Sequence, residues 1–157
     1  MNFDQAFDKL MGFEGGYTDN PNDPGGETCW GVTKSEAIAN GYTGKMKDFP
    51  VELAKEIYYQ KYWGKVQADQ LPDVLRYAVF DAAVNSGPTQ AAKWLQRAIG
   101  VSDDGVIGPK TITFVSCQNP DVVLRRMLSQ RLIFMTSLPA WNTFSKGWAR
   151  RIGGLLA

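Results

Sequence analysis

Residues 72–85 read PDVLRYAVFDAAVN, and this stretch decides the fold class. Apolar side chains fill nearly every turn of it, so a helix here has almost no polar face. A helix that is apolar all round is buried, and we therefore predict that residues 72–85 form the central helix. Asp81 lies within the run, and an unpaired buried carboxylate is costly. Asp81 is therefore predicted to be a structural residue that neighbouring donors satisfy.

Seven further helices are predicted on either side of this segment. Apolar residues at helical spacing define them, and capping residues, glycines and prolines mark their ends. The predicted ranges are 2–14, 33–40, 50–63, 89–99, 109–117, 119–138 and 142–152. The sequence thus predicts a mainly α fold of about eight helices around a buried central helix. The aromatic cluster in residues 58–63 has two readings, core packing or a wall that stacks on sugars.

The composition narrows the chemistry. The 157 residues include no histidine, which removes Ser-His-Asp and Cys-His catalysis and the usual zinc sites. Cys29 and Cys117 do not form a metal-ligand pattern, so we expect two free thiols, no metal and no cofactor. Carboxylate chemistry is what remains.

Charge is distributed unevenly along the chain. Residues 1–85 hold 8 Lys and Arg against 13 Asp and Glu, whereas residues 86–157 hold 9 against 3. The basic half indicates either a polyanionic partner or a solvated face. If Arg125, Arg126, Arg150 and Arg151 face such a partner, the activity should weaken with salt. The sequence has no run of 18 apolar residues and no N-terminal pattern typical of a signal peptide, so we expect no membrane insertion.

Glu14 is the candidate proton donor. It is the last residue of a short, predicted apolar helix, which Gly15 or Gly16 ends. Beside aromatic Phe13 and Tyr17 its carboxyl can be partly desolvated, which favours the neutral acid that gives a proton to a leaving group. The alternative is a solvated Glu in the last turn of a surface helix.

A turn-rich loop over residues 15–32 supplies the second carboxylate. Cleavage of a glycosidic bond usually needs two carboxyl groups, and either Asp19 or Asp23 could face Glu14 across a cleft. Thr28 could hold the attacking water. Asp23 has a second reading as a turn residue before Pro24. A short β-hairpin is compatible with this loop, and a loop of this length in a small domain is more often functional than idle.

Six segments carry a resemblance to a known family: residues 14–17, 22–28, 31–32, 80–87, 94–96 and 104–109. They resemble glycoside hydrolase family 108, whose members are bacterial and phage muramidases with a lysozyme-like, mainly helical fold. The resemblance implies that Glu14 is the catalytic acid and that Asp23 and Thr28 are the second carboxylate and the water-holding threonine. The C-terminal motif resembles the peptidoglycan-binding segment that accompanies the catalytic part.

The leading hypothesis is a monomeric phage-type endolysin. It would cleave the β-1,4 bond between N-acetylmuramic acid and N-acetylglucosamine in peptidoglycan, with Tyr17, Trp30 and Asn85 contacting the substrate. We expect a catalytic lobe over residues 1–87 and a peptidoglycan-binding lobe over 88–157 that share a core. The enzyme would wait in the host cytoplasm and reach the wall through a holin-type pore. The alternatives are a lytic transglycosylase and a non-catalytic wall-binding protein or structural virion component. A nucleic-acid partner is not expected, because the basic residues form no known motif.

Overall fold

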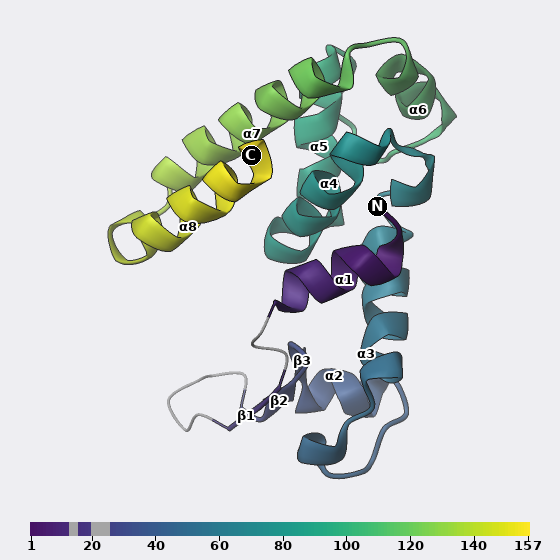
Figure 1. Cartoon of the computed structure of the whole chain (residues 1–157), viewed down its shortest axis with the longest axis vertical. Coiled ribbons are helices and arrows are strands. Elements are labelled where there is room, and N and C mark those ends of the chain that lie inside the picture. The colour runs from purple at the N-terminus through teal and green to yellow at the C-terminus, as the bar shows by residue number, and fades with distance from the viewer. Residues whose placement is uncertain (13–15, 20–25) are drawn as a thin grey trace. The chain divides into compact units, whose positions relative to one another are not determined.

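The chain forms two compact units, described here from a computed structural model. The structure describes residues 1–12, 16–19 and 26–157. Residues 2–61 form one unit, and Met1 together with residues 62–157 forms the other. Eight α-helices and one small sheet lie within the described ranges (Figure 1). The predicted mainly α, lysozyme-like fold is confirmed.

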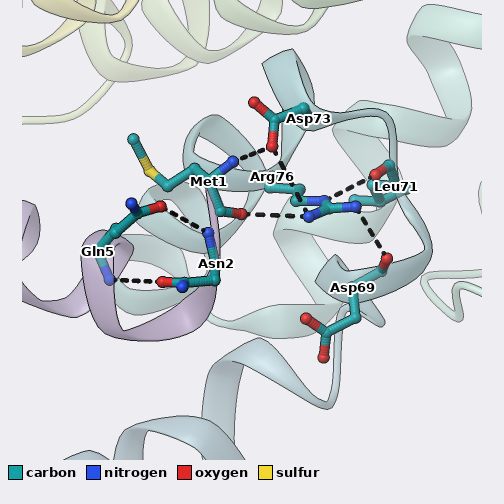
Figure 2. Close-up of polar contacts among 7 residues, drawn as sticks. All are labelled: Met1, Asn2, Gln5, Asp69, Leu71, Asp73 and Arg76. Atoms are coloured by element: carbon teal, nitrogen blue, oxygen red, sulfur yellow. Dashed lines mark hydrogen bonds and ion pairs between the residues drawn. The ribbon is translucent and has the colours of Figure 1, made fainter.

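Helix α1 (Phe3–Met11) opens the first unit and ends earlier than predicted. Asn2 caps it: its Oδ1 accepts from the Gln5 amide at 3.0 Å, and the Gln5 side chain accepts from the Asn2 amide (Figure 2). The chain leaves the helix at Gly12, which has φ +56°. The prediction that this helix runs to Glu14 is therefore wrong. Gly12 is the first residue able to adopt a left-handed φ cheaply, so it ends the helix before Gly15 or Gly16 is reached.

A three-stranded antiparallel sheet follows, where the sequence was compatible with a hairpin. Its strands are β1 (Tyr17–Thr18), β2 (Thr28–Cys29) and β3 (Val32–Thr33), in that order. Helix α2 (Lys34–Ala39), a 3₁₀ turn (Met46–Asp48) and helix α3 (Val51–Tyr58) complete the unit. Phe7 packs edge-on against Tyr58, with ring centroids 5.4 Å apart, at the centre of its core.

Helix α4 (Asp73–Ser86) is the buried centre of the second unit, as predicted. Helices α5 (Pro88–Ile99) and α7 (Pro120–Thr136) pack against it, and α8 (Trp141–Leu156) lies antiparallel beside α7 (Figure 1). A 3₁₀ turn (Ala68–Gln70) precedes α4, and α6 (Pro109–Ser116) packs on α5 and α7. Trp63, at the end of a π-helical turn (Tyr59–Trp63), is fully buried against Phe80.

The aromatic residues at 58–63 have two predicted roles, core packing and stacking on sugars, and the structure shows the first for some of them. Tyr58 and Trp63 are buried, each in the core of its own unit, which is the packing role. Tyr59 is 42% exposed, although its ring meets Phe3 edge-on at 5.1 Å. The cluster is therefore mostly core, and a sugar-stacking role stays a prediction for its exposed members.

Asp81 finds its donors in two arginines that follow far along the chain. Arg131 Nη1 donates to Oδ2 at 2.6 Å, and Arg151 Nε donates to Oδ1 at 2.7 Å. Asp81 and Arg131 are both buried, so this network joins α4, α7 and α8 inside the unit. The prediction of a satisfied structural carboxylate is confirmed. Arg151, one of the arginines considered for a basic surface, is paired with Asp81.

Arg76, the one cation in the apolar run, ties the start of α4 to the chain around it. Its guanidinium donates to the carbonyls of Leu71, Asp69 and Met1 at 3.0, 3.2 and 3.3 Å, and the terminal amine of Met1 pairs with Asp73 (Figure 2). A planar group with five donors suits this set of carbonyls, because each takes a different N–H. None of the helices in the described ranges has the length and apolar character to cross a membrane.

Candidate active site

Glu14 and Asp23, the predicted catalytic pair, lie outside the described residues. The structure describes the chain on either side of them: α1 and Gly12 before Glu14, β1 after it, and Gly26 onward after Asp23. The site is therefore described from the three-stranded sheet that adjoins these two residues in the sequence.

The register of the sheet separates two predicted residues. Tyr17 lies opposite Cys29, and Thr18 lies opposite Thr28. Directly paired residues share a face of a sheet and successive residues alternate, so Tyr17 and Thr28 project from opposite faces. Cys29 is buried, and burial raises the pKa of its thiol, which makes it a packing residue and not a nucleophile. Thr28 is half-buried on the opposite face.

Glu27 is a functional candidate that the sequence reasoning missed. The Tyr17 hydroxyl donates to its Oε1 at 2.9 Å, and Lys34 Nζ donates to its Oε2 at 2.9 Å. The hydrogen bond from Lys34, followed by that from Tyr17, lowers the pKa of Glu27. The same contact with Glu27, with smaller contributions from burial and Asp19, raises the pKa of Tyr17 to about 12.

Glu27, Tyr17 and Lys34 form a hydrogen-bonded group, here called the Glu27 cluster. Its carboxylate stays ionised and accepts from two partners, so it suits the stabilisation of positive charge and not the donation of a proton. It also fixes the hydroxyl of Tyr17, a predicted substrate contact. No periodicity marks Glu27 in the sequence; the available signal is its place beside Thr28 at the end of the turn-rich loop.

Trp30 adopts an unusual backbone conformation. Trp30 and Gly31 have φ values of +52° and +72° and form the two-residue turn between β2 and β3. Two left-handed residues match the twist of a tight hairpin, but such a conformation is uncommon for a bulky aromatic residue. The indole N–H of Trp30 donates to the Phe49 carbonyl at 3.3 Å, which helps hold the half-buried ring. Strained backbone conformations cluster at functional sites, and a substrate contact at Trp30 stays a prediction.

Asn85, the remaining predicted contact, belongs to the other unit. It lies exposed in the last turn of α4, where its Nδ2 donates to the Asp81 carbonyl at 2.7 Å. This bond fixes the amide plane and leaves the side-chain oxygen as a surface acceptor. The structure therefore brings Tyr17, Thr28 and Trp30 together in one small sheet, and it places Asn85 on a helix of the second unit.

The motif over residues 104–109 is organised by buried Gln96, a second residue that the sequence reasoning did not single out. Gln96 Nε2 donates to Asp104 Oδ1 at 2.7 Å and to the Val106 carbonyl at 3.0 Å, and its Oε1 accepts from the Gly105 amide at 2.9 Å. The bond from Gln96, with that from the Val106 amide, lowers the pKa of Asp104. Because Gln96 belongs to α5, these hydrogen bonds hold the loop of the motif against that helix.

Comparisons with known proteins identify the family of the chain. The glycosyl hydrolase 108 family model matches residues 7–87, and the model described as a predicted peptidoglycan domain matches residues 90–153. The structure is similar to that of SagA from Brucella abortus, with a TM-score of 0.85 and 36% identity over 98% of this chain and 91% of that one. Curated protein sequences yield no match.

The two matches meet near residue 88, whereas the compact units divide between residues 61 and 62. Helix α4 thus falls in the hydrolase match and packs in the second unit; the predicted lobes 1–87 and 88–157 stay a prediction. The match over residues 7–87 covers more than half of the chain. The chain therefore belongs to the glycosyl hydrolase 108 family and is a peptidoglycan-active glycoside hydrolase of the lysozyme type.

Proposed function

We propose that the chain hydrolyses the β-1,4 bond between N-acetylmuramic acid and N-acetylglucosamine, with Glu14 as the general acid. Asp23 acts as the base or charge stabiliser, and Thr28 holds the attacking water. Tyr17, Trp30 and Asn85 contact the glycan. The family match makes the chain a glycoside hydrolase, so a purely wall-binding role is not carried forward.

The observation that carries this proposal is the position of Glu14 within the matched segment. It stands between a capped helix that ends at Met11 and a strand that begins at Tyr17, in a chain without histidine. The carboxylate next along the described chain beyond the loop, Glu27, is held ionised by Lys34 and Tyr17. A neutral acid is needed for leaving-group protonation, and that role therefore goes to Glu14 and not to Glu27.

The deciding experiment replaces Glu14 by Gln, which keeps the size of the side chain and removes its proton. Turbidity clearing of purified cell wall should fall by about a hundredfold or more, the range expected for loss of a general acid. Glu52→Gln is the matched control, because Glu52 is exposed on α3 and has no place in the site. Near-normal clearing by Glu14→Gln, with both variants folded, would remove the assignment.

The transglycosylase alternative is separated by product chemistry and by Asp23. In that reaction the 6-hydroxyl of the substrate attacks in place of water, so a single carboxylic acid suffices. Mass spectrometry of digested wall should show reducing muramic ends and no 1,6-anhydro ends. Asp23→Ala should lower the rate if Asp23 activates water or stabilises charge, and intact activity with anhydro products would favour the transglycosylase.

The route to the wall is a separate proposal. As a phage-type endolysin the chain would accumulate harmlessly in the host cytoplasm and lyse the cell only when a holin-type pore opens. Expression with and without such a pore tests this: lysis in the absence of the pore would contradict it.

A further inference from the structure

We propose that a groove between α5 and α7 binds the free carboxylates of the peptide stems of peptidoglycan. The proposal rests on the proposed function only in taking peptidoglycan as the polymer; it concerns recognition at a place that takes no part in bond cleavage. The groove offers about 390 Å³ of space. Its lining residues are Arg97, Ala98, Arg125, Arg126, Ser129 and Gln130.

The groove is a product of helix spacing. On α7, Arg125 lies one turn before Ser129, and Arg126 lies one turn before Gln130. The four side chains therefore share one face of the helix. Opposite them the last turn of α5 contributes Arg97 and Ala98. Arg126 Nη1 reaches the Ala98 carbonyl at 3.4 Å, which draws its guanidinium across the groove.

The three guanidinium groups are not equally compensated. Arg97 is paired with Asp103 through two nitrogens, both at 2.6 Å. Within the described ranges, Arg125 has no ion pair or hydrogen bond, and Arg126 has only the Ala98 carbonyl. The lining side chains include no carboxylate. Two positive charges therefore face the groove without a protein counter-charge.

The chemistry of the lining selects among the parts of peptidoglycan. The glycan strand is uncharged, whereas the peptide stems carry free carboxylates. A guanidinium binds a carboxylate through two parallel hydrogen bonds, so Arg125 and Arg126 together can hold one or two stem carboxylates. The Ser129 hydroxyl and the Gln130 amide supply donors and acceptors for the peptide backbone beside them. The whole groove lies in the segment that matches the predicted peptidoglycan domain.

The test is cosedimentation of the full chain with purified wall at 4 °C, using short incubations. The double variant Arg125→Ala/Arg126→Ala should bind about tenfold more weakly than the wild type, because two charge-assisted contacts are lost. Arg125→Lys/Arg126→Lys should keep part of the affinity, since the charge remains and the fork is lost. Lys65→Ala/Lys146→Ala is the matched control. It removes the same charge from two exposed positions outside the groove and should bind as the wild type does.

Chemical blocking identifies the ligand. Amidation of the wall carboxylates with carbodiimide and methylamine should reduce wild-type binding to the level of the double alanine variant, which should itself be insensitive. An equal loss in the Lys65/Lys146 control would overturn the proposal in favour of general charge attraction. Unchanged wild-type binding to amidated wall would overturn it in favour of another anion, such as a wall phosphate.

The outcome is independent of the catalytic assignment. The substrate for this test is glycan strand stripped of its stems by an amidase and then treated with carbodiimide and methylamine, which blocks the muramic carboxylates that the amidase exposes. On these strands the Arg125/Arg126 double alanine variant should hydrolyse at the wild-type rate, because no carboxylate is left to bind. Glu14→Gln should do the reverse, binding intact wall normally while cleaving neither substrate. A double alanine variant that folds normally but loses activity on stem-free strands would contradict a stem-binding role.

Discussion

Two carboxylates, one in each unit, are held by two partners each, and they differ mainly in burial. Asp81 accepts from Arg131 and Arg151 at 2.6–2.7 Å inside the second unit, where it is 1% exposed. Glu27 accepts from Lys34 and Tyr17 at 2.9 Å on the surface of the first. In a dry interior, a lost partner leaves an uncompensated charge, whereas at the surface water replaces it. Burial therefore makes Asp81 a structural residue and leaves Glu27 free to act on a ligand.

The same contrast holds for the polar residues around them. Arg131 is fully buried, and its Nε and Nη2 have no hydrogen-bond partner among the described residues. In the described part of the chain, Asp81 is the one group that pairs with its charge. Tyr17, by contrast, is 42% exposed and presents an ordered hydroxyl and a ring to solvent. Arg131 is thus enclosed with its carboxylate, whereas Tyr17 and its carboxylate are open to solvent.

The largest expected effect comes from Asp81→Ala. Removal of the carboxylate leaves the Arg131 guanidinium buried and unpaired, and breaking a buried pair in this way destabilises proteins by about 3–5 kcal/mol. Arg151→Ala should have a smaller effect, because the Arg151 side chain is 37% exposed and Asp81 keeps Arg131. Urea denaturation followed by tryptophan fluorescence measures both free energies of unfolding.

The ranking of those two variants is the informative result. An Asp81→Ala variant no less stable than Arg151→Ala would show that the buried pair contributes no more than the exposed one. The contrast between the two carboxylates would then not rest on burial.

A middle-sized effect is expected at the turn that carries Trp30. A Cβ on Gly31 would lie 2.4 Å from the Tyr58 hydroxyl oxygen, and Gly31 has φ +72°. Gly31→Ala should therefore combine left-handed strain of about 1–2 kcal/mol with a steric clash of about 1–3 kcal/mol. Gly41→Ala is the control in the same unit, because Gly41 has φ +85° with nothing within 4 Å of an added Cβ. Chemical denaturation gives the difference between the two.

Tyr58→Phe tests the origin of that difference. The substitution removes the atom that the new methyl group would meet. In a double-mutant cycle Gly31→Ala should be less destabilising in the Tyr58→Phe background than in the wild type. Equal costs in both backgrounds would assign the whole effect to backbone strain.

The sequence predicts the second unit better than the first. The apolar run predicts helix α4 and its burial. Burial of the Asp81 carboxylate in turn predicts that it has hydrogen-bond partners. The identity of its partners does not follow, because Arg131 and Arg151 lie 50 and 70 residues away and only the packing of α7 and α8 brings them in. Long-range pairing is set by tertiary packing, which periodicity does not reveal.

The candidate site was predicted unevenly for a local reason. Tyr17, Thr28 and Trp30 lie in one turn-rich region of the sequence, but turn signals do not give a strand register. The register decides that Tyr17 and Thr28 project from opposite faces and lets Tyr17 reach Glu27. The predicted end of α1 is wrong because Gly12, Gly15 and Gly16 can each end a helix, and the sequence does not show which of them does. Gly12 takes the left-handed position that was assigned to Gly15 or Gly16.

The smallest effect, and the one that most directly probes the surface carboxylate, is the titration of Tyr17. Its pKa of about 12 means that the neutral hydroxyl is favoured in the folded chain, so this contact contributes stability below pH 10 and loses it as the pH rises from 10 to 12. Glu27 has the opposite sign: its lowered pKa contributes above the ordinary Glu value of 4.5 and is lost as the pH falls through the folded pKa. In a ¹³C NMR titration of tyrosine Cζ, Glu27→Gln should return the pKa of Tyr17 toward 10, because the ionised acceptor is gone. Lys34→Ala should raise the pKa of Glu27 while leaving a high Tyr17 pKa in place. An unchanged Tyr17 pKa in Glu27→Gln would mean that the ionised Glu27 does not control the hydroxyl, and Glu27 would then lose its claim to a place in the site.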